Sequence, residues 1–231
     1  MVFAYGDSTA GSRGNSTGSM ALDCLRMAVR ARDPLTPGRG LAAHEEGVAR
    51  LSMLLAEARG LPSERVELIG RAAGVHDIGK LAIPDAVLLN PGEPTRGEWG
   101  VLRAHTILGA RILGGSGDAT LDLAARIAAE HHEAFDGSGY PRGLRGDGIS
   151  PEARLVALCD VYDALRHVRP YKRALSHAEA MDVMRDGDHR MSPARFDPGM
   201  LRSFLDLDRH VEATWEEGEA AARSGAIQAS P

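Results

Sequence analysis

Histidine and aspartate side chains recur along this chain in a set that suits metal binding. Two adjacent pairs, at 76–77 and 131–132, carry little information alone because such dipeptides occur by chance. Imidazole and carboxylate groups together suit a first-row transition metal such as iron, manganese or zinc. A single metal seldom needs so many ligands, whereas two metals that share a bridging carboxylate would use them all. The candidate ligands are His44, His76, Asp77, His105, His131, His132 and Asp160.

Helical periodicity assigns several of these side chains to buried faces. His44 shares one face with apolar residues four, seven and eleven positions later in the chain. His76 and Asp160 fall on the apolar faces of their own segments. For any one buried histidine, a hydrogen-bonded core residue is the simpler interpretation. Because buried ionisable groups are costly unless they are paired or bound to metal, several of them on converging helices favour a metal centre.

Consecutive helices must position these side chains, since alternating strand patterns are scarce. The segment 133–150 contains five glycines and no apolar period, which predicts a long loop, and long ordered loops inside compact domains are often functional. We therefore expect an all-α bundle with a long glycine-rich loop between helices. The expected helices cover residues 20–32, 44–55, 64–76, 97–113, 121–132, 151–160, 176–185, 198–205 and 209–223.

Composition narrows the class of protein. With 231 residues and 43% hydrophobic content, the chain can bury a real core. A net charge of -5 argues against a protein that binds nucleic acid polymers. Cys24 and Cys159 form no CxxC pair and predict no disulfide framework. No apolar run approaches the ~18 residues of a membrane span, and no signal peptide opens the chain, so we expect a cytoplasmic protein.

Four segments resemble a known family when they are taken together and in order. Residues 76–80 read His-Asp-Ile-Gly-Lys, which resembles the HD metal-dependent phosphohydrolase motif. The pair 131–132 and the later triplet Gly-Tyr-Pro at 139–141 resemble the HD-GYP subgroup, named after that triplet. The segments 160–165 and 169–172 also look like that subgroup. The resemblance runs from about residue 31 to residue 205, and it implies an HD-domain helical bundle that hydrolyses cyclic di-GMP.

The resemblance also implies a role for each matching residue. One metal would be held by His44, His76, Asp77 and Asp160, and Asp77 would bridge to a second metal held by His105, His131 and His132. The two divalent metals would be iron or manganese, and a bridging water would be the nucleophile. Lys80 would act with Asp77 in catalysis by stabilising charge on the scissile phosphate. The residues that would contact the dinucleotide are Tyr140, Arg169 and Lys172.

Elementary chemistry agrees with these roles, but each has a simpler alternative. Two metals ~4 Å apart can bring the pKa of a bound water to roughly 7 and can clamp the attacking and leaving oxygens. Tyr140 could stack on guanine or merely close a turn. Lys80 could instead cap a helix, and Arg169 and Lys172 could be solvated surface charges. We interpret Asp163 and Glu133 as surface or capping residues rather than acceptors for ligand imidazoles.

The chain departs from the family pattern at its first ligand helix. Some members carry a glutamate one helical turn before the first histidine ligand, where it supports a third metal. Here that position is Gly40, which favours two metals over three. Gly47 also replaces a common arginine, and residues 166–168 replace a short polar sequence. These departures keep a second hypothesis open, a weakly active module that binds cyclic dinucleotides or a protein partner, and a third, an HD phosphohydrolase acting on another nucleotide.

The predicted organisation has three parts. Residues 1–19 form a flexible arm, residues 20–207 the HD-GYP catalytic domain, and residues 208–231 a C-terminal helix and tail. An arm of this length holds no sensor domain of the kind most members carry. Regulation would therefore come from a separate signalling partner, or the chain is a fragment of a larger protein. A homodimer is an open alternative for its assembly.

Overall fold

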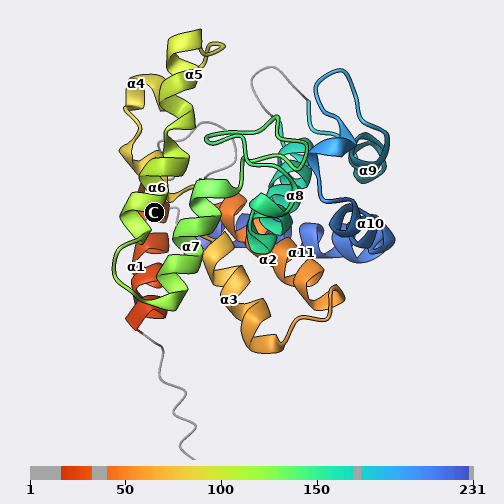
Figure 1. Ribbon diagram of the computed structural model, residues 1–231, viewed down its shortest axis with the longest axis horizontal. Helices are drawn as coiled ribbons and strands as arrows, with labels where there is room; N and C mark the ends of the chain where they lie inside the picture. The colour runs from red at the N-terminus through yellow and green to blue at the C-terminus, as the bar shows by residue number, and fades with distance from the viewer. Residues whose placement is uncertain (1–16, 33–40, 169–172, 229–231) are drawn as a thin grey trace, which may run out of the picture.

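The computed structural model describes residues 17–32, 41–168 and 173–228, and every regular element in these ranges is a helix (Figure 1). This confirms the all-α class. The first half contains α1 (Thr17–Arg32), α2 (Leu41–Ala58), α3 (Ser63–Ala73), the 3-10 helix η2 (Ile78–Ala82), α4 (Asp85–Leu88), α5 (Arg96–Arg103) and α6 (His105–Leu113). The second half contains α7 (Ala119–Glu130), η3 (Gly146–Gly148), α8 (Pro151–Arg166), α9 (His177–Asp186), η4 (Pro193–Arg195), α10 (Pro198–Asp206) and α11 (Asp208–Gln228).

Helix α2 is the centre of the bundle. It packs against α3, α8 and α11, and also touches α1 and α10. Its apolar stripe, which includes Val48, Leu51 and Leu55, is fully buried. Helix α8 crosses beside it and buries Val156 and Tyr162 in the same core. The two helices that carry the first and last predicted ligands are therefore held together by the main hydrophobic core.

The expected helix through His76 is wrong, because α3 ends at Ala73. Gly74 is the C-cap, and its N–H donates to the carbonyls of Ala72 and Gly70. Beyond Gly74 the N–H groups of Val75 and His76 donate to carbonyls three residues earlier, so the i to i−4 pattern of the α-helix ends there. His76 and Asp77 consequently lie in the turn between α3 and η2.

The expected helix 97–113 is also wrong, since the chain breaks at Ala104 into α5 and α6. Two side chains compete for carbonyls just before the break. Nδ1 of His105 donates to the carbonyl of Leu102 at 2.6 Å, and Oγ1 of Thr106 donates to that of Arg103 at 3.0 Å. Such local bonds offer the backbone an alternative to the helical ladder. Helix α5 has no buried residue and projects with α4 at the upper left of Figure 1.

Smaller boundary differences appear at the start of α1 and at the end of α7. Helix α1 begins at Thr17, inside the predicted arm, where the Gly18 N–H donates to Asp118. Helix α7 ends at Glu130, two residues earlier than expected. The loop 133–150 is confirmed, with only the short η3 inside it. Trp215 packs against the core, whereas Trp99 is 47% exposed on α5.

The C-terminal helix α11 packs along α2 and buries Val211. Helix α11 therefore covers one face of α2 and contributes to the hydrophobic core. No helix within the described ranges combines the length and the apolar character that a membrane crossing requires.

Candidate metal centre

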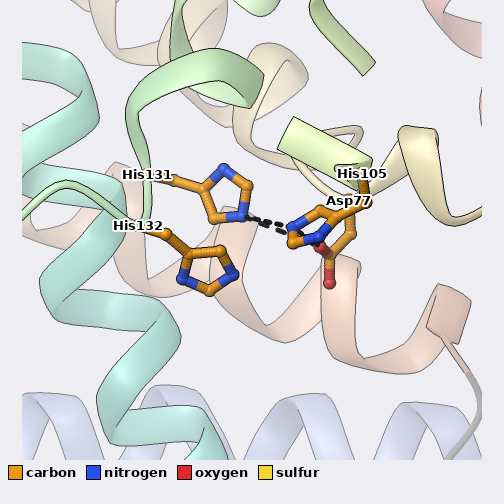
Figure 2. Close-up of side chains that lie close together, drawn as sticks. All are labelled: Asp77, His105, His131 and His132. Atoms are coloured by element: carbon orange, nitrogen blue, oxygen red, sulfur yellow. Dashed lines mark hydrogen bonds and ion pairs between the residues drawn. The ribbon is translucent and has the colours of Figure 1, made fainter. Parts of the chain in front are cut away.

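All seven predicted ligands converge in the structure, and their donor atoms fall into two groups. Within each group the donor atoms lie within 4.8 Å of one another. Figure 2 shows the first group, in which the imidazoles of His131 and His132 face His105 and Asp77. The first group is Asp77, His105, His131 and His132, and the second is His44, His76 and Asp160.

Asp77 connects the two groups because each of its carboxylate oxygens faces a different one. Oδ1 lies 3.2 Å from Nε2 of His105 and 3.7 Å from Nε2 of His131. Oδ2 lies 3.6 Å from Nε2 of His76 and 3.8 Å from Nε2 of His44. A carboxylate with this arrangement can bind one cation through each oxygen.

Asp160 and His132 complete the contacts between α8 and the rest of the centre. Oδ1 of Asp160 lies 3.2 Å from Nε2 of His44. Its other oxygen lies 4.0 Å from Nδ1 of His132. Both groups thus combine imidazole nitrogens with a carboxylate, which suits iron, manganese or zinc better than calcium or magnesium.

Four of the histidines are oriented by a hydrogen bond from Nδ1 to an oxygen. His76 and His105 donate to the carbonyls of Ala73 and Leu102, at 2.7 and 2.6 Å. His131 points Nδ1 at the carbonyl of Ala128 at 3.0 Å, and His44 donates to Oδ2 of Asp163 at 2.7 Å. A proton on Nδ1 leaves Nε2 free to bind metal, and such outer contacts fix the ring orientation.

Nε2 of His76 and Oδ1 of Asp77 are buried at the centre, and neither has a hydrogen-bond partner among the described residues. Buried polar atoms are nearly always paired, because leaving one unsatisfied costs about 1–3 kcal/mol. Both atoms point into the space shared by the two groups. A bound cation would satisfy both, so the residues present fit a metal centre.

Burial and neighbouring charges prepare most of these groups for metal binding. Burial lowers the pKa of His76 to about 4, although Asp77 opposes the shift, so the ring is a neutral donor at pH 7. Burial and then His131 lower the pKa of His132 well below its usual value. Burial opposes ionisation of Asp77, but Lys80 and His76 outweigh it and hold the pKa of that carboxyl well below normal.

His44 behaves differently, because it lies between two carboxylates. Burial lowers its pKa, but hydrogen bonds to Asp160 and Asp163 outweigh this effect and raise the pKa to about 10. In the metal-free protein, His44 is therefore a cation at pH 7 that balances the two carboxylates. A metal must displace that proton to bind at Nε2.

Metal removal should make stability depend on pH through His44. Its folded-state pKa of about 10 lies above the ordinary value of 6.5, so its contribution is complete below pH 6.5 and is lost as pH rises to about 10. We expect the melting temperature of chelator-treated protein to fall over this range, and metal affinity to rise as the competing proton leaves. The His44→Gln variant should lack this component, and equal pH profiles for the two proteins would contradict the assignment.

Lys80 lies beside the centre on η2 and donates a hydrogen bond to Oδ2 of Asp77. Its side chain is 28% exposed, so the ammonium can reach the open side of the site. Gly79 allows this segment to approach α6, because a Cβ there would overlap the backbone carbonyl of His105. The close packing of η2 on α6 thus sets Lys80 and Asp77 against the His105 ligand.

The glycine-rich loop places Tyr140 next to the ligands. The Tyr140 ring lies 4.8 Å from the His132 ring, between centroids. Gly139 makes this approach possible, since a Cβ there would overlap the backbone of Glu133 and Ala134. Burial, together with Asp77 and Asp160, raises the pKa of Tyr140, so its phenol keeps its proton and can donate a hydrogen bond.

Glu133 and Glu130 are buried acids that hold the loop in place. The Glu133 carboxylate accepts the backbone N–H groups of Arg142 and Leu144, and Glu130 accepts the Ser150 N–H and the Arg142 guanidinium. The interpretation of Glu133 as a surface residue is wrong, because the loop folds back over it. The sequence of a loop without an apolar period does not indicate which of its polar side chains will be buried.

Three further residues near the centre, of which the sequence pattern had indicated only Asp163, contact the predicted site residues or lie beside them. Arg103 extends over the Tyr140 ring, 4.9 Å from its centroid. Asp163 is buried, and its contact with His44 contradicts the surface interpretation. Glu45 is buried beside His44 with Oε1 unpartnered, and burial and then Asp77 raise the pKa of its carboxyl. The spacing of Asp163 from Asp160 could have suggested a shared helix face, whereas Arg103 and Glu45 carried no such signal.

Two predicted substrate contacts, Arg169 and Lys172, lie outside the described residues, and so does Gly40. Gly47 is buried on α2. The four-residue segment 169–172 follows directly after α8 and Val168, which is 71% exposed.

A match to a protein-family model identifies the family of this chain. A family model described as HD domain matches residues 24–199. The chain belongs to the HD domain family. This confirms the family that the motifs predicted, and the two His/Asp groups fall inside the matched residues.

Curated relatives of this HD domain protein are longer than it is. It is 40% identical over 188 residues to the cyclic di-GMP phosphodiesterase response regulator RpfG of Xanthomonas campestris, covering 81% of this chain and 48% of RpfG. It is 41% identical over 148 residues to the 3'3'-cGAMP-specific phosphodiesterase 2 of Vibrio cholerae, covering 64% and 27%. The chain thus spans about half the length of RpfG, and less of the second relative.

A solved structure shares the fold of this HD domain. Bd1817, described as an HDG"Y"P protein from Bdellovibrio bacteriovorus, superposes with a TM-score of 0.59 at 22% identity. The match covers 85% of this chain and 65% of Bd1817.

Proposed function

We propose that this protein is a two-metal phosphodiesterase that hydrolyses cyclic di-GMP to linear pGpG, to GMP or to both. The observation that carries the proposal is Asp77, whose two oxygens face two different groups of ligands. His44, His76 and Asp160 would hold one metal, and Asp77 would be shared. The other metal would be held by His105, His131 and His132. The 40% identity to RpfG supports cyclic di-GMP as the substrate.

Two divalent metals, iron or manganese, would supply a water of lowered pKa and would spread charge on the phosphoryl oxygens. The protein's own residues would do the rest. Asp77 would keep both ligand groups in one arrangement. Lys80 would turn from Asp77 toward the scissile phosphate, where its ammonium would stabilise the charge that develops during hydrolysis.

The substrate would lie between the ligands and the glycine-rich loop. Tyr140 would form one wall, and its protonated phenol would donate a hydrogen bond. Arg103 already covers part of that ring, and its forked guanidinium suits a phosphate or a guanine edge. We propose Arg103 as a substrate contact in addition to Arg169 and Lys172.

Metal analysis together with a turnover assay tests the proposed function. The protein is purified anaerobically, its iron and manganese are measured per chain, and cyclic di-GMP is added. We expect about two metals per chain and conversion to pGpG or GMP. Metal-loaded protein that converts none of the substrate would contradict the proposal, and ligand binding without product would favour the binding-module alternative.

A second candidate substrate is 3'3'-cGAMP, because a relative at 41% identity is named as specific for it. The chemistry at the scissile phosphate would be the same, since the two dinucleotides differ only in one base. A panel of cyclic di-GMP, 3'3'-cGAMP and cyclic di-AMP at equal concentration distinguishes them. The ratio of their kcat/KM values assigns the preference.

Replacing Tyr140 by alanine should weaken substrate binding and leave the metals in place. Loss of an aromatic ring that stacks on a base costs about 1–3 kcal/mol of binding free energy per base, or roughly 5- to 150-fold in KM. Tyr140→Phe should keep most of the effect of the ring and serves as the matched control. Because Arg103 contacts the same ring, Arg103→Ala should be less than additive with Tyr140→Ala. Loss of metal in Tyr140→Ala would contradict a role limited to substrate.

Three expectations from the sequence stay predictions. They are the cytoplasmic location, the three-part domain division and a regulatory protein partner or homodimer. Fractionation of cells and size-exclusion chromatography of the purified protein would test the location and the assembly.

A further inference from the structure

We infer that the C-terminal helix α11 positions the metal ligand His44 through a chain of three side chains, Asp163, His167 and Glu219. The inference rests on the proposed metal centre and adds positioning residues that lie away from it. Helix α11 also lies beyond residues 24–199, which are the residues that the HD domain family model matches.

The first link joins His44 on α2 to Asp163 on α8. Nδ1 of His44 lies 2.7 Å from Oδ2 of Asp163, and the Asp163 side chain is only 1% exposed. This bond fixes the plane of the His44 ring and leaves Nε2 facing Asp160 and Asp77. Outer contacts of this kind set the orientation and basicity of metal-binding histidines.

The second link joins Asp163 to His167, one helical turn later on α8. Nδ1 of His167 lies 2.7 Å from the carbonyl of Asp163 and 3.3 Å from its Oδ2. Asp163 therefore contacts a histidine on α2 and a second histidine on its own helix.

The third link joins His167 to α11. Nε2 of His167 lies 3.2 Å from Oε1 of Glu219, and both side chains are about five-sixths buried. Because carbonyl and carboxylate oxygens only accept hydrogen bonds, these contacts favour a His167 ring that donates from both nitrogens.

Trp215 holds the same ring from the side. Its indole lies 5.4 Å from the His167 ring between centroids, and the Arg166 guanidinium stacks 3.9 Å from the indole centroid. Arg166 and His167 of α8 thus pack against Trp215 of α11, next to the chain of side chains that leads from Glu219 to His44. A shift of α11 along α8 would move Glu219 and change the contacts of Asp163 and His44.

Substitution of Glu219 tests this inference by metal affinity rather than by turnover. Glu219→Gln keeps the shape of the side chain and removes its charge, and Glu217→Gln changes an exposed glutamate of the same helix as the matched control. Metal dissociation constants are measured by competition with a chelator, and the melting temperature of the metal-free protein is measured in parallel. We expect about tenfold weaker binding in Glu219→Gln, the low end of the range for outer contacts of ligand histidines.

The expected loss is confined to one of the two metals, because the contacts among the described residues carry this chain of side chains to His44 of the second group. His167→Gln should give a similar loss, and the double variant should be no worse than either single one if both act through Asp163. The melting temperature of the metal-free protein should change little in Glu219→Gln.

Two results would overturn the inference. One is a Glu219→Gln variant with wild-type metal affinity, and the other is an equal loss of both metals accompanied by a lower melting temperature, which would indicate a general structural role. Wild-type protein that binds two metals but turns over no cyclic dinucleotide would contradict the proposed function alone, since the affinity comparison does not depend on turnover.

Discussion

Asp77→Ala is expected to lose its metals and its phosphodiesterase activity together. Each oxygen of Asp77 lies within 3.8 Å of two imidazoles, and the two oxygens face different ligand groups, whereas the nearer oxygen of Asp160 lies 4.0 Å from His132 of the first group. Removing one preorganised group that stabilises charge costs about 10²–10³ in kcat, and loss of both metals should cost more. Metal content by elemental analysis and turnover of cyclic di-GMP measure the two effects in one preparation.

A matched control for this variant is Asp182→Ala, which removes an exposed aspartate on α9. It should keep its metals and its activity. Circular dichroism should show that Asp77→Ala retains its helices, because the core of α2 and α8 does not depend on this carboxylate. Full metal stoichiometry in Asp77→Ala would show that the bridging assignment is wrong.

Lys80→Gln should separate metal binding from catalysis. In the metal-free protein the Lys80 ammonium donates to Oδ2 of Asp77, an oxygen that a metal would also use. Removing the cation therefore removes a competitor, and we expect metal affinity equal to or above that of the wild type. Loss of charge stabilisation at the phosphate should lower kcat by about 10²–10³-fold.

The conservative variant Lys80→Arg keeps the charge and should retain part of the activity, although a planar guanidinium does not reproduce the geometry of an ammonium. Steady-state kinetics with metal-saturated protein measures the effect. A Lys80→Gln variant that turns over at the wild-type rate, or that loses metal, would contradict the proposed contact with phosphate and leave Lys80 as a support for Asp77.

The buried centre also bears on how the chain could be regulated. The chain of side chains that leads from His44 through Asp163 and His167 ends at Glu219 on α11, a helix that packs against α2. A partner that displaced α11 would change the contacts of one metal ligand without touching the substrate side of the site. Such coupling would act on the His44 group more strongly than on the group around His105.

The sequence alone determined the helical class, the long glycine-rich loop and all seven residues of the two ligand groups. It could do so because burial of a helical face and the chemistry of His and Asp leave local patterns, and because these patterns occur in the order of a known family. It misplaced the helix ends at Ala73 and Ala104, where side-chain hydrogen bonds from His76, His105 and Thr106 to nearby carbonyls outweigh the apolar period.

Only the tertiary structure decided which ligands share a group and what supports them. The division into two groups depends on how α2, α6, α7 and α8 pack, and the two-sided position of Asp77 depends on a turn that periodicity had predicted as helix. Several supporting contacts join residues that are far apart in the chain. Glu133 binds the backbone of the folded loop, Asp163 binds His44 on a neighbouring helix, and Arg103 lies over the Tyr140 ring. Contacts between residues far apart in the chain leave no local pattern, because burial and hydrogen-bond partners at such positions are set by the packing of other segments.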